Sequence, residues 1–257
     1  MSKNIQILDC TLRDGGLGLE DAEKNDLSHV RFSENDSRMT AGYLADSAID
    51  IIELGSIEIT SDDRTGFCIY KNIEDISKQM PLKKKQNQMF AALYRGPDTP
   101  IDDIPKWNPS LCEAVRVIIR YSELQKSLDF CAALSSKGYK VFVQPMLTMR
   151  YTKEEIQLLI EKSNEMNAYA LYFVDSYGYM ENRDVVDLFN VYDEGLKPQI
   201  KIGFHAHNNM NLAFSNVQTF IDMNSANLTA RIVCTAFSSP IFLRFASCAV
   251  ISNIYSS

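Results

Sequence analysis

KVFVQPMLTMRYTKEEIQLLIEKSNEMNAYALYFV, residues 140–174, contains the alternation that decides the fold. Its two ends, Lys140–Gln144 and Ala170–Val174, are short apolar runs of the kind found in buried strands. Between them, apolar residues recur at helical spacing, and Thr152 and Glu155 form the T-x-x-E sequence of a capping box. The stretch therefore predicts a strand, a helix and a second strand that lies parallel to the first.

The same alternation continues in both directions along the chain. Further strands are predicted at Ile5–Asp9, Asp50–Leu54, Met89–Leu93, Ala114–Ile119 and Ile200–His205, with a last one near Asn227–Val233. One strand–helix barrel typically takes ~250 residues, and this chain has 257. We therefore expect an α/β fold of the (β/α)8 TIM-barrel class, with residues 1–232 as its catalytic domain.

Residues 233–257 depart from this alternation. From Met223 to Ser257 there is no Asp, Glu or Lys, and only Arg231 and Arg244 carry charge. Because a helix of a soluble barrel needs a polar face, we expect an atypical tail in place of the final helix, and hence an incomplete or aberrant last unit. We hypothesise that the tail is truncated or encoded out of frame, which translation of the coding DNA in all three frames would test.

Composition narrows the classes of partner. The formal net charge of -7 argues against a nucleic acid or an anionic membrane as partner. No apolar run approaches the ~20 residues of a membrane span, and the first residues do not resemble a signal peptide. The six cysteines are scattered without a CxxC pair. We therefore expect a cytoplasmic protein with reduced, mostly buried thiols.

Two of the three histidines lie in the sequence His205-Ala206-His207, directly after a predicted strand. Side chains at positions i and i+2 point to the same face of a strand, so both imidazoles could bind one ion at the C-terminal mouth of the barrel. Neutral imidazole is the commonest metal ligand. On this motif alone, two solvated loop histidines remain an alternative.

A second polar motif, DCTLRDGG at residues 9–16, follows the first predicted strand and so lies at the same mouth. Asp14 offers a hard carboxylate oxygen, and Arg13 offers a fixed cation suited to a carboxylate or a developing enolate oxygen. Gly15 and Gly16 permit backbone conformations that other residues resist. A surface Arg–Asp pair in a turn is the alternative interpretation.

Together, the two motifs predict a divalent-metal site. Asp14, His205 and His207 would leave three octahedral positions open, which suits Mn²⁺ or Mg²⁺ chelated by a 2-oxo acid, and Zn²⁺ is a further possibility. Such an ion would polarise the ketone and stabilise an enolate.

With these motifs, DCTLRDGG and GFHAHNNMNLAFSN at residues 203–216, the sequence resembles the metal-dependent lyases and synthases of the pyruvate-carboxyltransferase domain type. This superfamily includes 4-hydroxy-2-oxovalerate aldolase, 3-hydroxy-3-methylglutaryl-CoA lyase, and the isopropylmalate and homocitrate synthases. The resemblance runs from about Ile5 to Asn227 and is strongest to the 4-hydroxy-2-oxovalerate aldolases. The paired motifs are specific, whereas either one alone is not.

The resemblance implies a role for each matching residue. It implies that Asp14, His205 and His207 bind the ion and that Arg13 stabilises the enolate. Glu53, at the end of the second predicted strand, would either hold the residues that contact the ion in position or transfer a proton. Three further residues would bind the substrate: Asp175, Ser176 and Asn208. For Glu53 and Asp175, a buried carboxylate with only a structural role is the alternative.

Two departures from the family bear on the reaction. The 4-hydroxy-2-oxovalerate aldolases have a histidine base shortly after the TLRDG motif, where this chain has Leu17, and we interpret the third histidine, His29, as a surface residue. The identity of the base is therefore open. The glycine-rich segment with an Asn ligand that the CoA lyases carry after the eighth strand is also absent, and we interpret Cys234, which lies nearby, as a core residue.

We accordingly expect an aldolase-type lyase that makes or breaks a C–C bond next to a 2-oxo acid through a pyruvate-like enolate. Its partners would be a 2-oxo acid and an aldehyde, with a homodimer implied by resemblance only. A Claisen-type acyltransferase that uses acetyl-CoA is the first alternative, although its DGEQ-like motif is DGGL here. An inactive metal-binding barrel is the second. The sequence does not identify the aldehyde, the ion or the oligomer.

Overall fold

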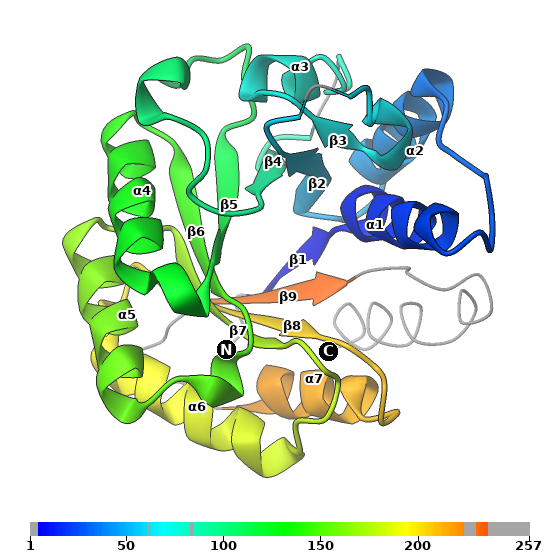
Figure 1. The fold of residues 1–257 in the computed structure, drawn as a ribbon. Coiled ribbons are helices and arrows are strands. Elements are labelled where there is room, and N and C mark those ends of the chain that lie inside the picture. The colour runs from blue at the N-terminus through cyan, green and yellow to red at the C-terminus, as the bar shows by residue number, and fades with distance from the viewer. Residues whose placement is uncertain (1–4, 61, 83–84, 224–229, 236–257) are drawn as a thin grey trace.

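The computed structural model describes residues 5–60, 62–82, 85–223 and 230–235, which form a closed parallel barrel. The strands of the closed ring, in order around it, are β1 (Ile5–Asp9), β2 (Ile51–Ile57), β4 (Met89–Tyr94), β5 (Ala114–Ile119), β6 (Lys140–Pro145), β7 (Ala170–Asp175), β8 (Lys201–Ala206) and β9 (Arg231–Thr235). β9 pairs in parallel with both β8 and β1, which closes the ring (Figure 1). The predicted (β/α)8 fold is confirmed.

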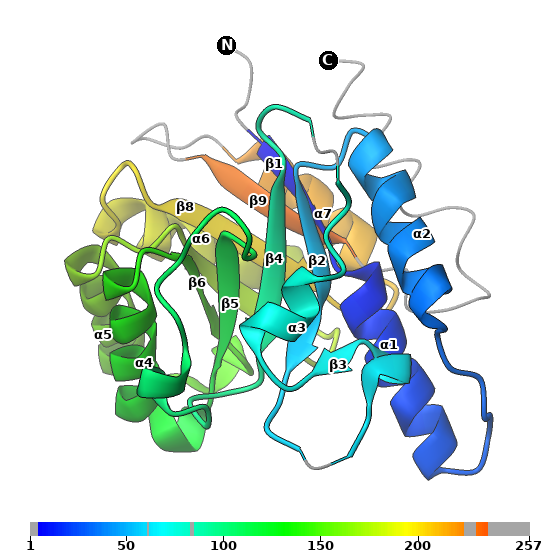
Figure 2. The ribbon, with the colours of Figure 1, turned by 90° about the horizontal axis from the view of Figure 1, so that it is seen from above.

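Helices cover the outside of the ring (Figures 1 and 2). They are α1 (Thr11–Lys24), α2 (Glu34–Asp46), α3 (Ile73–Ser77), α4 (Leu124–Ser136), α5 (Lys153–Glu165), α6 (Asn182–Gly195) and α7 (Ala213–Asp222). The predicted capping box of α5 is present, because Thr152 accepts from the amide of Glu155 while the Glu155 carboxylate accepts from the amide of Thr152. No helix within the described part of the chain is long and apolar enough to cross a membrane.

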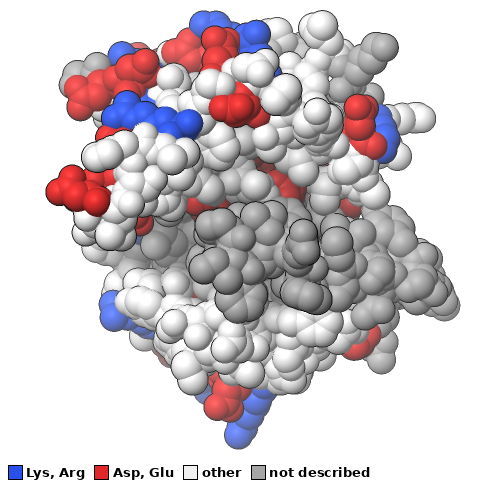
Figure 3. All heavy atoms as spheres, turned by 90° about the vertical axis from the view of Figure 1, so that its right-hand side faces the viewer, with Lys and Arg blue, Asp and Glu red and all other residues white. Residues whose placement is uncertain are grey.

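Two apolar cores follow from this arrangement. The larger lies between strands and helices, where the inner faces of the helices are buried. The smaller fills the inside of the ring with side chains such as Leu8, Ile51, Phe142 and Tyr172. The described part of the face in Figure 3 shows acidic and basic side chains interspersed rather than gathered into one broad patch.

Most predicted strands differ from the observed ones only at their ends, and two, β1 and β5, match at both ends. β2 continues beyond Leu54 to Ile57, and its last residues pair with a short additional strand, β3 (Ile69–Tyr70). The last predicted strand is observed as β9, so the expected domain boundary between residues 232 and 233 falls inside it. The rest of the expected tail, residues 236–257, lies outside the described residues.

The DCTLRDGG motif begins at the end of β1 and continues into α1, and its glycines do not use the unusual backbone conformations that they permit. Residues 11–16 form the first turns of α1, and neither Gly15 nor Gly16 has a positive φ. Gly16 is required by close packing instead, since a Cβ there would lie 1.9 Å from the carbonyl oxygen of Phe67. The loop around Phe67 can therefore rest directly on α1, which holds Arg13 and Asp14 at the mouth of the barrel.

Candidate metal centre

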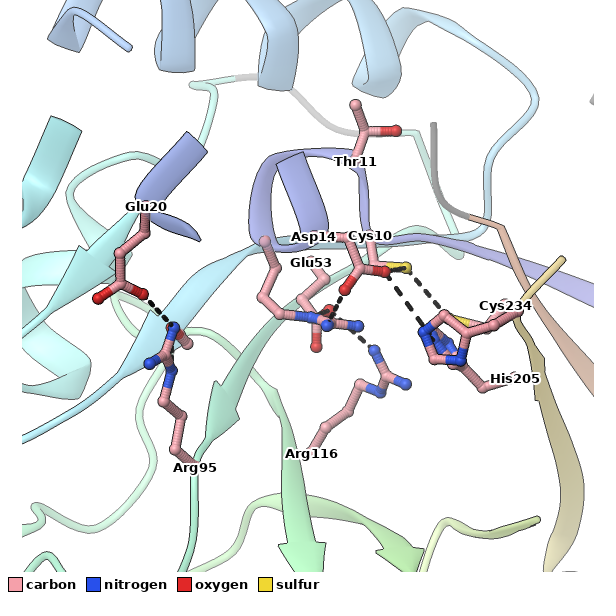
Figure 4. Close-up of polar contacts among 12 residues, drawn as sticks. Cys10, Thr11, Asp14, Glu20, Glu53, Arg95, Arg116, His205 and Cys234 are labelled. Atoms are coloured by element: carbon pink, nitrogen blue, oxygen red, sulfur yellow. Dashed lines mark hydrogen bonds and ion pairs between the residues drawn. The ribbon is translucent and has the colours of Figure 1, made fainter. Parts of the chain in front are cut away.

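The strand order brings the two sequence motifs together. β1 ends next to the start of α1, β8 carries His205, and β9 lies between them with Leu8 paired to Cys234 and Cys234 paired to His205. All three strands are parallel, so their carboxyl ends open at the same side of the ring. The candidate site therefore lies across the seam that β9 closes (Figure 4).

Two of the three predicted metal ligands, Asp14 and His207, each lie close to the third, His205. Nε2 of His205 lies 3.4 Å from Nε2 of His207 and 3.9 Å from Oδ2 of Asp14. Nδ1 of His207 lies 2.7 Å from the backbone carbonyl of Asp175, so it donates to that oxygen and leaves Nε2 with its lone pair free to bind a cation. These residues supply the donors of a divalent-cation site, because a second imidazole nitrogen and a carboxylate oxygen lie near Nε2 of His205.

The local electrostatics keep these groups in forms that bind cations. Burial opposes ionisation of Asp14, but the adjacent Arg13 guanidinium outweighs it and holds the pKa of this carboxyl below its usual value. His207 is exposed at the mouth, and partial desolvation of its ring, together with the adjacent His205, lowers its pKa. At neutral pH the aspartate is thus anionic and the His207 ring is neutral.

Arg13 links the metal ligands to the interior of the barrel. Its guanidinium forms an ion pair with Asp14, and its Nε donates to Oε2 of Glu53 at 2.8 Å. Nη2 of Arg13 is buried and has no hydrogen-bond partner among the described residues. One donor of this fixed cation is therefore available for an anionic oxygen at the mouth.

Glu53 is held by a second arginine that the sequence interpretation missed. Arg116, on β5, is fully buried and donates through Nη1 to the same Oε2 of Glu53 at 2.8 Å (Figure 4). Its guanidinium lies 5.2 Å from the ring centroid of Tyr172. The signal was a single charged residue inside the otherwise apolar run AVRVII. Glu53 thus positions two guanidinium groups.

The inside of the ring below the mouth has unused hydrogen-bonding capacity. Within the described chain, buried polar atoms without partners include Nε and Nη2 of Arg116, Oε1 of Glu53, Oε1 of Gln144 and the hydroxyl of Tyr172. Tyr172 fits inside only because β8 has a glycine beside it: a Cβ on Gly203 would lie 2.3 Å from the tyrosine ring. Such an interior suits a small polar ligand that supplies the missing partners.

The three predicted substrate-binding side chains make local contacts in the structure. The carboxylate of Asp175 accepts from the backbone amides of Tyr179 and Met180, and the hydroxyl of Ser176 accepts from the amide of Leu147. Asn208 is exposed and accepts from the amide of Ala213 at the start of α7. Their assignment as substrate ligands stays a prediction.

A cavity of about 460 Å³ opens beside Arg13. Leu17, Arg95 and Arg120 are among its lining residues. Arg95 pairs with Glu58 at 2.9 Å, and Arg120 pairs with Asp98, so both cations are neutralised by neighbours. Leu17 faces this cavity at the position where the resemblance places a histidine base, which gives the cavity an apolar side chain next to Arg13.

Two cysteines border the candidate metal ligands. Cys10, at the start of α1, and Cys234, on β9, are buried with their Sγ atoms 3.3 Å apart, and Cys10 donates to Oδ2 of Asp14 at 3.2 Å. Burial and the adjacent thiol raise the pKa of Cys10. Cys234 is buried, as its interpretation as a core residue requires, but it also lies next to His205.

Comparison with known proteins concerns the chain as a whole rather than these residues. The HMGL-like family model matches residues 4–225. The chain is 26% identical over 237 residues to 4-hydroxy-2-oxovalerate aldolase of Shewanella woodyi, covering 88% of this chain and 64% of that protein. It is 28% identical over 229 residues to the protein of the same name from Carboxydothermus hydrogenoformans, covering 86% and 63%. The chain thus spans less than two thirds of these relatives.

Solved structures show the same fold. HMG-CoA lyase from Brucella melitensis superimposes with a TM-score of 0.70 at 11% identity, over 99% of this chain and 91% of that one. The carboxyl transferase domain of Rhizobium etli pyruvate carboxylase superimposes with a TM-score of 0.65 at 15% identity, over 92% and 40%. At these identities the likeness concerns the barrel alone.

Proposed function

This chain belongs to the HMGL-like family, and from that premise we propose that it is a divalent-metal-dependent aldolase-type lyase acting next to the ketone of a 2-oxo acid. The observation that carries the proposal is the placement of Asp14 and His207 near Nε2 of His205, beside Arg13. The relatives named 4-hydroxy-2-oxovalerate aldolase support it. We propose for this chain the same class of reaction that their name describes.

Asp14, His205 and His207 would hold the cation, with Mn²⁺ or Mg²⁺ as the proposed ion and Zn²⁺ as the alternative. A cation bound there supplies Lewis-acid polarisation of a ketone oxygen. Arg13 would place its guanidinium, with the buried and unpartnered Nη2, against the anionic oxygen that develops when the enolate forms.

Two further features suit this reaction class. Arg116 adds a second buried cation below Arg13, and its unpartnered Nε and Nη2, with the hydroxyl of Tyr172, would donate to the carboxylate of a small 2-oxo acid. The cavity beside Arg13 would take the aldehyde, with Leu17 in contact with its carbon chain. Aldol cleavage breaks the C–C bond to the carbinol carbon, leaves the electron pair on the enolate and passes the hydroxyl proton to a base.

The first test separates enolate formation from the choice of aldehyde. Pyruvate in D₂O with the protein and Mn²⁺ or Mg²⁺ is expected to exchange its methyl protons, followed by NMR, and to form an aldol product with one of a panel of aldehydes. Asp14→Asn is expected to abolish exchange, whereas His29→Ala, at an exposed position, leaves it unchanged.

A protein that binds the ion but neither exchanges pyruvate protons nor forms an aldol product would overturn the lyase proposal. It would support an inactive metal-binding barrel instead. Release of free CoA from acetyl-CoA in the presence of a 2-oxo acid, without pyruvate exchange, would support a Claisen-type acyltransferase.

A further inference from the structure

A second set of possible metal ligands overlaps the first. The thiols of Cys10 and Cys234 and the imidazole of His205 place one ligand atom each within 4.8 Å of one another. The three residues come from the start of α1, from β9 and from β8, which are neighbours around the seam of the barrel (Figure 4). All three side chains are buried, so water competes little for an ion among them.

The spacing suits a small four-coordinate ion. A tetrahedron with metal–sulfur bonds of ~2.3 Å has donor–donor edges of about 3.7 Å. The two Sγ atoms are 3.3 Å apart, and Oδ2 of Asp14 lies 3.2 Å from Sγ of Cys10 and 3.9 Å from Nε2 of His205. Two sulfurs and one imidazole nitrogen therefore lie within reach of one ion, and the Asp14 carboxylate lies next to two of these donors.

These sulfur and nitrogen donors favour a different class of ion from the one expected at Asp14, His205 and His207. Thiolate and imidazole ligands favour Zn²⁺ and similar thiophilic cations, whereas carboxylate, imidazole and open water positions suit Mn²⁺ or Mg²⁺. We propose that Cys10, Cys234 and His205, with Asp14 as fourth ligand, bind a thiophilic divalent cation such as Zn²⁺ or Cd²⁺. Each thiol that ligates the ion releases its proton to solvent.

This thiophilic site and the harder one are mutually exclusive. Asp14 and His205 belong to both sets of ligands, whereas His207 belongs to the harder site alone and the two cysteines to the thiophilic site alone. A thiophilic ion would therefore displace the harder one and remove Asp14 and His205 from it. This inference needs no catalytic activity, so it stands or fails separately from the proposed lyase reaction.

The test uses Cd²⁺ and Co²⁺ with the reduced, metal-free full chain. Titration is expected to produce sulfur-to-metal charge-transfer absorption that saturates at one ion per chain. Cys234→Ser and Cys10→Ser should each remove most of this absorption and weaken Cd²⁺ binding by at least about tenfold, because even outer ligand contacts are worth that much. His207→Ala and Cys131→Ala are the matched controls and should keep the absorption; Cys131 is buried in the outer core, away from the site.

Competition with Mn²⁺, followed by electron paramagnetic resonance of the released ion, gives a second readout. In the wild-type chain Cd²⁺ should displace Mn²⁺, and in Cys234→Ser this displacement should need at least about tenfold more Cd²⁺. Retained Mn²⁺ binding by Cys234→Ser shows that the variant folds, with circular dichroism as the check if the wild type binds no Mn²⁺. Cd²⁺ binding without charge-transfer absorption, or absorption that survives both cysteine substitutions, overturns the proposal.

Discussion

Glu53 and Arg116 form an ion pair in which neither side chain is exposed, with Nη1 of the arginine 2.8 Å from Oε2 of the glutamate. The same oxygen also accepts from Arg13, so one carboxylate compensates two cations inside the barrel. Removal of a carboxylate from such a position leaves buried charge without compensation. Glu53 is therefore a structural requirement for the arginine geometry whatever part it takes in proton transfer.

The first prediction concerns stability. Glu53→Gln should lower the free energy of unfolding by about 3–5 kcal/mol, measured by urea denaturation, because the fully buried Arg116 loses its counter-charge while Arg13 keeps only Asp14. Glu58→Gln is the control: Glu58 also pairs with two arginines, Arg64 and Arg95, but is 34% exposed, and its loss should cost about 1 kcal/mol or less. Equal effects of the two substitutions would contradict this reading of Glu53.

The second prediction concerns the ion. His207→Ala should weaken Mn²⁺ binding at least tenfold, a lower bound set by the effect of outer contacts on metal affinity, as measured by calorimetry. The reason is that Nε2 of His207 faces Nε2 of His205 at 3.4 Å while Nδ1 is anchored on Asp175. His29→Ala changes an exposed histidine and should leave the affinity unchanged. Undiminished binding by His207→Ala would remove this residue from the ligand set.

A matched pair on one helix tests the packing of the motif. Gly16→Ala should destabilise the protein by about 1–3 kcal/mol, because its methyl group would meet the backbone of Phe67. Gly18→Ala, two residues along α1, meets nothing within 4 Å and should stabilise the helix by about 0.5–1 kcal/mol. Thermal or urea unfolding of both variants measures the difference, and a stabilising Gly16→Ala would refute the close approach.

Substitution of Asp175 distinguishes a structural role of this side chain from a role in substrate binding. Asp175→Ala removes the acceptor of two backbone amides and should lower stability by about 1–3 kcal/mol. If the side chain acts only through the loop, kcat for pyruvate exchange falls while KM stays near its wild-type value. A large rise in KM with unchanged stability would instead show direct contact with the substrate. Asp187→Asn, at a surface ion pair, is the control.

Asp50 makes stability depend on pH. Burial raises the pKa of Asp50, partly offset by the hydrogen bond from the amide of Ile7. The folded state then binds the proton more tightly than the unfolded state, so this contribution to stability is fully present below the unfolded pKa of about 4 and is lost as pH rises through the folded value. Urea unfolding across that window should show a steeper decline for wild type than for Asp50→Asn. Parallel curves would contradict the assignment.

The fold was largely predictable because parallel strands that are buried on both faces appear in the sequence as short, nearly continuous apolar runs. β1 and β5 were placed at both ends, since their apolar runs are bounded by polar residues. β3 and α3 were missed because such short elements have no periodicity to detect. α1 was missed because three glycines within it suggest a loop. Gly16 is there to allow close packing on Phe67, and that contact between distant residues cannot be seen in the sequence.

Part of the candidate site was likewise predictable from the sequence, and part of it was not. The proximity of Asp14 and His207 to His205 was predictable, because side-chain alternation and the shared mouth of a barrel bring these motifs to the same end of the fold. Arg116 and the Cys10–Cys234 contact were not, since a buried ion pair and a thiol pair across two strands depend on register and on which face of each strand turns inward.

The pairing of β1 with β9 also governs the order in which the protein can assemble. Leu8 meets Cys234 across nearly the whole described chain, and such distant contacts form late and slow folding. Asp14 on α1 and His205 on β8 lie on the two sides of this last strand, so the proposed cation site would be complete only after it docks. An ion that bound only the closed ring would favour closure, and metal supply would then promote the completion of folding.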